Sequence, residues 1–475
     1  MNGNETIAAV STAPGEGGIG IVRVSGSRAA EIAGKIFVPC PGDFLDRVMY
    51  YGHIIDPSSG EKVDEVFCVY MRGPRSYTGE DVCEIQCHGG SVPLRRILGL
   101  VCRFGAVPAQ PGEFTKRAFL NGRLDLAQAG AVIDLIRSKT ERGYTAARDQ
   151  AEGRLSEQVS AAREILLEVL AEIAVRIDYP EEFEGDRQDQ GQKGGFLSDL
   201  HFGFDKAEGI IAELLEGYEA GRIIRDGLRV VIIGKPNAGK SSLFNALARE
   251  DTAIVTSVPG TTRDALEVWL DVRGVPVLLV DTAGLRDSVD EVERLGARRA
   301  LMQYERADLC IILLDGSEPF SEEDLQVASC LDPAKKHIVA INKTDLPQAL
   351  ERSDAAGLFG GLIYAEEILE LSLIDDKAGN YKAMTATIED RIEEIVVNKS
   401  LSGSSLLVTK EQHKGLLEAA AAEIREARAA VFSGASAEFF EVNIRGAYAA
   451  LGEIIGEEAS DDVIEKVFEE FCVGK

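Results

Sequence analysis

The most informative stretch of the sequence is GKPNAGKSS at residues 234–242. It fits the pattern GxxxxGK[ST], follows the apolar run LRVVII and precedes the helix-like run SLFNALA. In such a loop, glycines let the backbone wrap around phosphate oxygens, while successive N–H groups and the N-terminus of the following helix face the anion. Lys240 would reach the terminal phosphates, and the Ser241 hydroxyl would bind Mg²⁺. The stretch therefore predicts a site for a nucleoside triphosphate.

A second motif, NKTD at residues 342–345, ends the apolar run HIVAI. Asp345 can accept hydrogen bonds from N1 and the exocyclic N2 of guanine, and adenine lacks that pair of donors. The motif therefore favours GTP over ATP. The equivalent of a further guanine-contacting loop, usually SA[RK], reads SLI at 372–374, so the backbone contact can persist while the small residue and the basic stem are missing.

Two shorter motifs lie between these. DTAG ends the apolar run VPVLLV, where Asp281 can hold Mg²⁺ through water and Gly284 can turn toward the γ-phosphate. GTTRD offers Thr262 as a second Mg²⁺ ligand beside Ser241. Four motifs in this order predict a GTP-binding domain. The residues assigned to GTP are Asn237, Ala238, Gly239, Lys240, Ser241, Ser242, Gly260, Thr261, Thr262, Asp281, Thr282, Ala283, Gly284, Asn342, Lys343, Asp345 and Ser372, and the family resemblance described below adds Thr256, Ser257, Val258 and Pro259.

Hydrolysis of GTP needs a group that orients water. Many small GTPases carry a glutamine directly after DxxG, but this chain has Leu285, whose apolar side chain cannot do so. The acidic segment RDSVDEVER that follows offers Asp290, Glu291 and Glu293. The alternative is that this segment is only a solvated acidic surface. Lys235 occupies a variable position of the phosphate-binding loop, and we assign it no role.

The elements that must position these motifs change character along the chain. Residues 1–122 mix short alternating strands with helical patterns and predict an α/β domain. Residues 123–222 carry apolar residues at the three and four spacing of amphipathic helices. Residues 223–390 contain near-continuous apolar strands, typical of a mostly parallel sheet, and helices return over 391–475. We therefore expect a multidomain protein with the P-loop α/β domain inserted into an all-α domain.

The composition limits the functions that the chain can have. The 51 Lys plus Arg against 79 Asp plus Glu, a formal net charge of -28, argue against a general polyanion binder. Eight scattered cysteines indicate a reducing compartment, and with no signal peptide or membrane span we expect a cytoplasmic protein. Cys83, Cys87 and His88 suggest a metal site, but the spacing lacks a second ligand pair, and buried strand cysteines are the favoured interpretation.

These motifs together resemble the MnmE family, also called TrmE, of tRNA-modifying GTPases. The resemblance rests on GKPNAGKSSL, GTTRD, DTAGLR with DEVER, NKTD and the C-terminal FCVGK. It extends to TIAAVSTAPGEGGIGIVRVSG, SYTGEDVCEIQCHGG and PGEFTKRAFLNGRLDLAQAGAVIDLI, which match the family's folate-binding domain, and so covers essentially the whole chain.

For the GTPase site, the resemblance implies a catalytic glutamate at Glu293 that orients or polarises water. Mg²⁺ would be held by Ser241 and Thr262. A K⁺ ion would take the place of an arginine finger and promote contact between two GTPase domains. The residues implied for K⁺ are Asn237, Thr256, Val258 and Thr261.

For the N-terminal domain, the resemblance implies a site for 5-formyltetrahydrofolate or a related tetrahydrofolate, at a homodimer interface. The matching residues are Arg23, Glu84, Arg123 and the C-terminal Lys475. Cations suit the glutamate tail of a folate, and a carboxylate suits the donor edge of its ring.

The family acts with MnmG, an FAD-dependent partner, in a heterotetrameric complex. Together they install an aminomethyl-type group, such as carboxymethylaminomethyl, on C5 of the wobble uridine of certain tRNAs, with the folate as one-carbon donor. The net negative charge of the chain opposes tRNA binding, so we expect the partner to supply much of the RNA-binding surface. No membrane is involved.

Two alternatives stay open at this point. A ribosome-assembly or translation GTPase shares the four motifs, but it predicts a basic RNA-binding appendage. The C-terminal FCVGK is either a frayed end or a short arm that carries Lys475 to folate and Cys472, as a catalytic residue, to the uridine chemistry or the partner.

Overall fold

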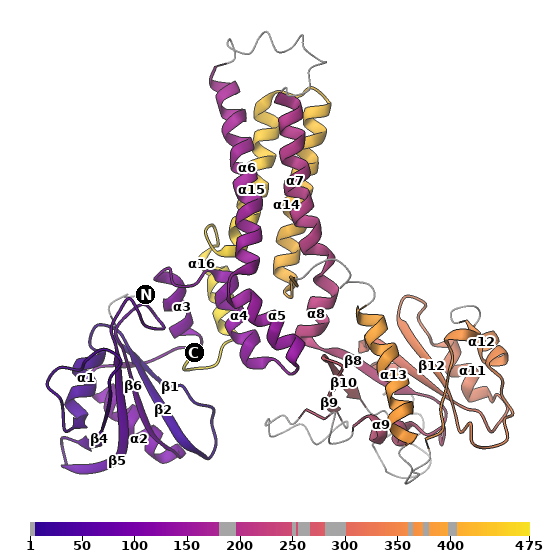
Figure 1. The fold of residues 1–475 in the computed structure, drawn as a ribbon, viewed down its shortest axis with the longest axis horizontal. Coiled ribbons are helices and arrows are strands. Elements are labelled where there is room, and N and C mark those ends of the chain that lie inside the picture. The colour runs from indigo at the N-terminus through magenta and orange to yellow at the C-terminus, as the bar shows by residue number, and fades with distance from the viewer. Residues whose placement is uncertain are drawn as a thin grey trace. The chain divides into compact units, whose positions relative to one another are not determined.

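We describe a computed structural model of the chain. The structure describes residues 5–179, 196–248, 253–254, 267–280, 301–359, 364–373, 380–397 and 406–475. The chain forms two compact units (Figure 1). Unit 1 comprises 1–136, 148–208 and 419–475, and unit 2 comprises 137–147 and 209–418.

Unit 1 contains a seven-stranded sheet in the order β3-β4-β5-β6-β2-β1-β7. All described pairings in it are antiparallel except that of β1 with β7. The apolar residues that face inward along the strands pack against α1 and α2 in one continuous core. The elements are β1 (Ile7–Val10), β2 (Gly17–Ser25), α1 (Ala29–Ile36), β3 (Phe37–Val38), β4 (Met49–Asp56), β5 (Glu61–Met71), β6 (Val82–Gly89), α2 (Ser91–Arg103), β7 (Val107–Pro108) and α3 (Glu113–Leu120).

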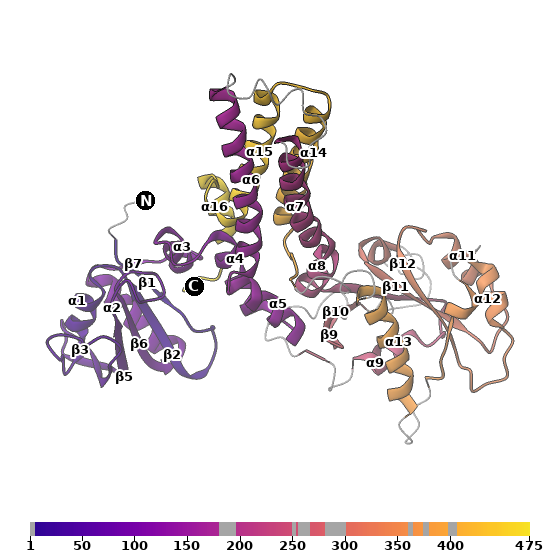
Figure 2. The same ribbon diagram turned by 45° about the horizontal axis from the view of Figure 1, so that its top comes forward.

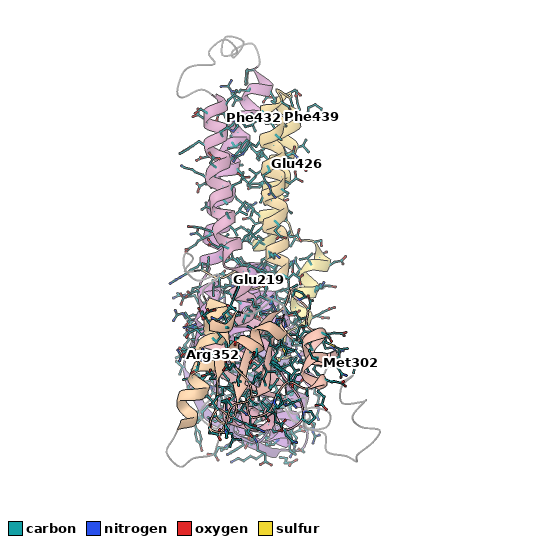
Figure 3. The ribbon with its side chains drawn as sticks, turned by 90° about the vertical axis from the view of Figure 1, so that its right-hand side faces the viewer. Glu219, Met302, Arg352, Glu426, Phe432 and Phe439 are labelled. Atoms are coloured by element: carbon teal, nitrogen blue, oxygen red, sulfur yellow. The ribbon has the colours of Figure 1, made fainter. Side chains whose placement is uncertain are left out.

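The remaining described elements of unit 1 are helices. The long α6 packs along α15, and both bury an apolar stripe with three and four spacing, as the sequence predicts. Figure 3 labels Phe432 and Phe439, which flank the turn between α14 and α15 and are both exposed. The helices are α4 (Leu126–Arg137), α5 (Glu141–Ala151), α6 (Arg154–Asp178), α7 (Phe196–Glu216), α14 (Glu411–Phe432), α15 (Ala437–Ile455) and α16 (Asp461–Glu469); of these, α4, α5, α7 and α14 run on into unit 2.

Unit 2 contains a six-stranded sheet in the order β13-β12-β11-β8-β10-β9. It is parallel except for the pairing of β9 with β10. Every residue of β11 is buried, which explains the continuous apolar run. The elements are α8 (Tyr218–Asp226), β8 (Leu228–Ile233), α9 (Lys240–Leu247), β9 (Glu267–Val272), β10 (Val275–Val280), β11 (Leu309–Asp315), α11 (Glu322–Ser329), β12 (Lys336–Asn342), α12 (Arg352–Leu358), β13 (Leu369–Glu370) and α13 (Asn380–Val397).

The expected fold class is confirmed: an N-terminal α/β domain, a helical domain, and an α/β domain with a mostly parallel sheet between helical segments. Among the described residues, no helix is both long and apolar enough to cross a membrane. Cys83 and Cys87 are buried on β6, whereas His88 is exposed and pairs with Asp64. Because neighbouring residues of a strand point to opposite faces, the two thiols and the imidazole do not converge.

Candidate functional site

The phosphate-binding motif spans the loop after β8 and the first turn of α9, the strand, loop and helix order that the sequence predicts. Two of its glycines are required by their surroundings. A Cβ on Gly234 would lie 2.3 Å from the carbonyl oxygen of Leu313, and one on Gly239 would lie 2.3 Å from Nδ2 of Asn342. Gly239 also has a φ of +104°, which side chains disfavour. The loop can therefore lie close to its neighbours only with glycine at both positions.

Two side chains brace this loop. Nζ of Lys240 donates to the carbonyl oxygens of Gly234 and Lys235, at 2.8 Å each. Nδ2 of Asn342, a buried residue at the end of β12, donates to the carbonyl oxygen of Ala238 at 2.8 Å. Asn342 therefore joins the guanine motif to the phosphate-binding loop, although the two are far apart in sequence.

The remaining described residues of the guanine motif are also held in place. Nζ of Lys343 lies 2.5 Å from Oδ2 of Asp315, at the end of β11. Burial opposes ionisation of Asp315, but hydrogen bonds from Lys343 and Ser317 outweigh it and leave the pKa of the carboxyl below its ordinary value. The Ser372 hydroxyl donates to Asp345 at 2.5 Å. The serine that remains of the SA[RK] loop therefore contacts the predicted guanine acceptor.

Three more predicted residues of the GTP site lie on the phosphate-binding loop and the first turn of α9. Ser241 and Ser242 are exposed on the first turn of α9, and Asn237 is exposed in the loop with a φ of +60°. Other predicted residues fall outside the described residues. They are Ile374 of the SLI segment, some of the K⁺ and Mg²⁺ ligands, the residues of DTAG and the catalytic glutamate. These residues of the GTP site are Thr256, Ser257, Val258, Pro259, Gly260, Thr261, Thr262, Asp281, Thr282, Ala283, Gly284 and Glu293.

A second cluster of predicted residues lies in unit 1. Arg23 on β2 faces Glu84 on β6 across the antiparallel pair, and Nε of Arg23 donates to Oε1 of Glu84 at 2.8 Å. The two side chains are only 15% and 16% exposed, so the ion pair is partly shielded from water.

Aromatic rings complete this cluster. The guanidinium carbons of Arg23 and Arg123 each lie 5.3 Å from the centre of the Tyr77 ring, and that of Arg23 lies 5.7 Å from the Phe114 ring. Nη1 of Arg123 also donates to the carbonyl oxygen of Ser76 at 2.5 Å. Nη1 of Arg23 is buried and has no hydrogen-bond partner among the described residues. A buried donor without a partner is costly, and an acceptor on a ligand would satisfy it.

The C-terminal residues dock onto the N-terminal domain. The amide of Gly112 donates to the carbonyl oxygen of Cys472 at 3.4 Å, and the Ser11 hydroxyl donates to that of Gly474 at 3.1 Å. Phe471 is buried in the helical core near α4, which anchors the tail, while Cys472 is exposed. Figures 1 and 2 show the C-terminus beside α3. The tail therefore has fixed contacts in the structure, as expected of an arm rather than a frayed end.

The docked tail brings Lys475 into the electrostatic field of the Arg23 and Glu84 pair. Burial and the nearby Arg23 charge lower the pKa of Lys475 below its ordinary value, against the opposing effect of Glu84. Arg23, Glu84 and Lys475 therefore belong to one cluster, with Arg123 joined to it through Tyr77.

Sequence reasoning missed Tyr77 and Phe114 in this cluster. Tyr77 lies within SYTGEDVCEIQCHGG and Phe114 within PGEFTKRAF, both singled out for the resemblance, but no spacing signal identifies an aromatic residue that will face an arginine. Their role follows from the loop between β5 and β6, which carries Tyr77, and from the first turn of α3, which carries Phe114; only the fold brings these to Arg23.

Two family models and the full-length relatives that match this chain all point to one family. A family model described as the MnmE helical domain matches residues 126–472, and one described as the N-terminus of GTP-binding protein TrmE matches residues 6–123. The chain is similar to the tRNA modification GTPase MnmE of Alkaliphilus oremlandii (strain OhILAs), at 46% identity over 99% of both chains. It is 43% identical to the protein of that name from Geobacillus kaustophilus (strain HTA426), again over 99% of both. Among solved structures, the G domain of the T. maritima FeoB iron transporter aligns with 25% identity over 34% of this chain and 98% of its own, with a TM-score of 0.24, a score that supports no conclusion.

Proposed function

Because this chain belongs to the MnmE family of tRNA modification GTPases, we propose that it acts with MnmG, an FAD-dependent partner, on the wobble uridine of certain tRNAs. The chain is a GTP hydrolase that acts in tRNA modification. In the proposed reaction an aminomethyl-type group, such as carboxymethylaminomethyl, is added to C5 of that uridine. The protein works in the cytoplasm as a homodimer within a heterotetrameric complex. The relationship over 99% of the chain disfavours the alternative of a ribosome-assembly or translation GTPase.

For GTP hydrolysis, we assign Lys240 and the loop N–H groups to the phosphates and Asp345 to guanine. Ser241 and Thr262 would bind Mg²⁺, and Asn237, Thr256, Val258 and Thr261 would bind K⁺. Glu293 would orient the attacking water, because Leu285 cannot.

For the one-carbon unit, we propose that 5-formyltetrahydrofolate or a related tetrahydrofolate binds at Arg23, Glu84, Arg123 and Lys475. The residues present fit such a ligand. Three cations suit its carboxylates, Glu84 is an acceptor for ring N–H groups, and the Tyr77 and Phe114 rings offer apolar surface. When bound, the folate supplies the one-carbon unit, while the residues of this chain bind and orient it.

The observation that carries the proposal is the buried Nη1 of Arg23, a donor without a partner among the described residues, in the cluster that Lys475 reaches through the docked tail. A ligand acceptor would remove the cost of this donor.

Calorimetry of the full chain with 5-formyltetrahydrofolate tests the folate site. Wild type should bind, and Arg123→Ala should lose most of the affinity because it removes a cation held beside Tyr77. Arg103→Ala, an exposed arginine paired with Asp56 on the same domain, is the matched control and should bind like wild type. No binding by wild type would exclude the folate assignment.

Wobble-uridine analysis of tRNA from cells with and without the protein tests the reaction itself. Cys472→Ser should abolish the modification and leave GTP hydrolysis unchanged, because the thiol is exposed and its main-chain contacts do not depend on the side chain. Full modification by this variant would remove Cys472 from the chemistry.

A further inference from the structure

Lys235, the second residue of the phosphate-binding loop, carries a buried ammonium group. Its side chain is only 7% exposed, and its Nζ lies 3.1 Å from Oε2 of Glu318 and 3.5 Å from Oδ2 of Asp324. Lysine is seldom so buried unless it is paired. The side chain therefore ties the phosphate-binding loop to the segment that follows β11.

The two acidic partners differ in rigidity. The Asp324 side chain is 4% exposed, whereas that of Glu318 is 64% exposed. Asp324 also accepts hydrogen bonds from the amide of Ser321 at 3.0 Å and from its hydroxyl at 2.8 Å, in a capping box at the start of α11. Asp324 is thus the fixed anchor, while Glu318 makes the shorter contact from the solvent-exposed side, where ion pairs are weakened by water.

Asp315, Glu318 and Asp324 form an acidic cluster around Lys235, and this cluster also contacts the guanine motif. Burial lowers the pKa of Lys235, but Glu318, Asp324 and Asp315 together outweigh it and raise the pKa, so the ammonium stays charged. Asp315 itself pairs with Lys343. One cluster of carboxylates therefore anchors both the phosphate-binding loop and the guanine-binding segment.

The main chain of Lys235 has a second task. Its carbonyl oxygen accepts hydrogen bonds from Nζ of Lys240 at 2.8 Å and from the amide of Ala238 at 3.3 Å. Lys235 is therefore anchored by the acidic cluster through its side chain, and through its carbonyl oxygen it holds both the turn of the loop and the side chain of Lys240.

We propose that Lys235 is a positioning residue for GTP binding, which acts through Lys240 and the loop N–H groups and does not touch the nucleotide. Its pair with Asp324 fixes the loop before the phosphates arrive, so less ordering remains when GTP or GDP binds. The proposal concerns the GTPase activity and does not depend on the folate site.

Nucleotide binding by Lys235→Met in the full chain tests this role. The variant has a side chain of similar length without the charge, so the anchor is lost while the loop sequence otherwise remains. The dissociation constants of fluorescent GTP and GDP analogues should rise alike, by about tenfold or more, since both nucleotides use the loop. The kcat at saturating GTP should stay within about twofold. Lys235→Arg, which keeps the cation, should restore most of the affinity.

Two further variants separate positioning from a general loss of stability. Asp354→Ala weakens the capping box of α12, in the same unit, without touching Lys235 or its acidic partners, and should lower the unfolding temperature but leave the dissociation constants unchanged. In Lys235→Met, the buried Asp324 carboxylate loses its cation. The double variant Lys235→Met, Asp324→Asn removes that uncompensated charge, and it should fold better than Lys235→Met alone while nucleotide binding stays weak. Wild-type affinity in Lys235→Met or in the double variant would overturn the proposal. So would an equal loss of affinity in Asp354→Ala.

Discussion

Single residues decide whether the C-terminal lysine reaches the N-terminal cluster. Gly474 has a φ of +96°, and a Cβ there would lie 2.1 Å from the carbonyl oxygen of Val10. The adjoining hydrogen bond from the Ser11 hydroxyl to Gly474 joins residues 463 positions apart. A glycine is therefore required where the tail crosses β1, and the position of Lys475 depends on it.

Gly474→Ala should displace the tail and reduce the affinity for 5-formyltetrahydrofolate, because Lys475 would leave the Arg23 and Glu84 pair. Calorimetry on the full chain measures this loss. Gly434→Ala is the matched control, since Gly434 also has a positive φ, +71°, but nothing lies within 4 Å of an added Cβ. It should cost about 1 kcal/mol of stability and leave folate binding unchanged. Equal affinity in the two variants would contradict the role of the tail.

At the scale of one element, the first turn of α14 contains a buried histidine. His413 is 6% exposed, and its Nδ1 has no hydrogen-bond partner among the described residues. Burial, helped by the positive charges of Lys410 and Arg225, lowers its pKa to about 3. The folded chain therefore keeps this imidazole neutral at pH values where an unfolded chain would protonate it.

The sign of the resulting pH effect follows from this depressed pKa. The stability that depends on neutral His413 is fully present above pH 6.5 and is lost as the pH falls toward about 3. Between pH 7 and pH 5 the loss should be roughly 2 kcal/mol in the free energy of unfolding.

His413→Leu should remove this part of the pH dependence, because leucine does not titrate. Urea unfolding at several pH values, followed by the fluorescence of Trp269, measures the effect. Trp269 is the only tryptophan of the chain, and it belongs to unit 2 with His413. Parallel curves of stability against pH for the variant and wild type would show that the imidazole is not kept neutral.

At the scale of the whole molecule, the chain passes back and forth between its two units. Residues 137–147 belong with the GTPase sheet although helical residues of unit 1 flank them on both sides. Within unit 2, Nζ of Lys139 lies 3.8 Å from the centre of the Trp269 ring, and Arg142 pairs with Glu393 at 2.8 Å. Trp269 lies on β9, so residues 137–147 contact the strand that follows the GTTRD segment.

Replacement of Na⁺ by K⁺ should raise GTP turnover by about tenfold, because a bound cation would offset the charge that develops on the phosphates. Sedimentation should show that K⁺ with a transition-state analogue of GTP hydrolysis also favours dimers. Asn237→Ala should bind GTP but lose the K⁺ response. Equal turnover of wild type in the two salts would exclude the potassium assignment.

The sequence by itself determined the nucleotide motifs, the mostly parallel sheet and the family. Each of these is a local signal, since the residues of GKPNAGKSS and NKTD are consecutive and a buried parallel strand is a continuous apolar run. The Mg²⁺ ligand Thr262, the residues of DTAG and the catalytic Glu293 were likewise predicted from short motifs and the family resemblance, and they stay predictions.

The tertiary structure alone decided which distant residues meet. Arg23 and Glu84 are 61 positions apart and become partners through the register of β2 and β6, while Lys475 joins them through the docking of the tail. Lys235 carried no signal in the sequence, because its partner Asp324 is set by the cap of α11 and the order of strands β8 and β11. Burial gives these charges their strength, and burial arises only when the whole chain has folded.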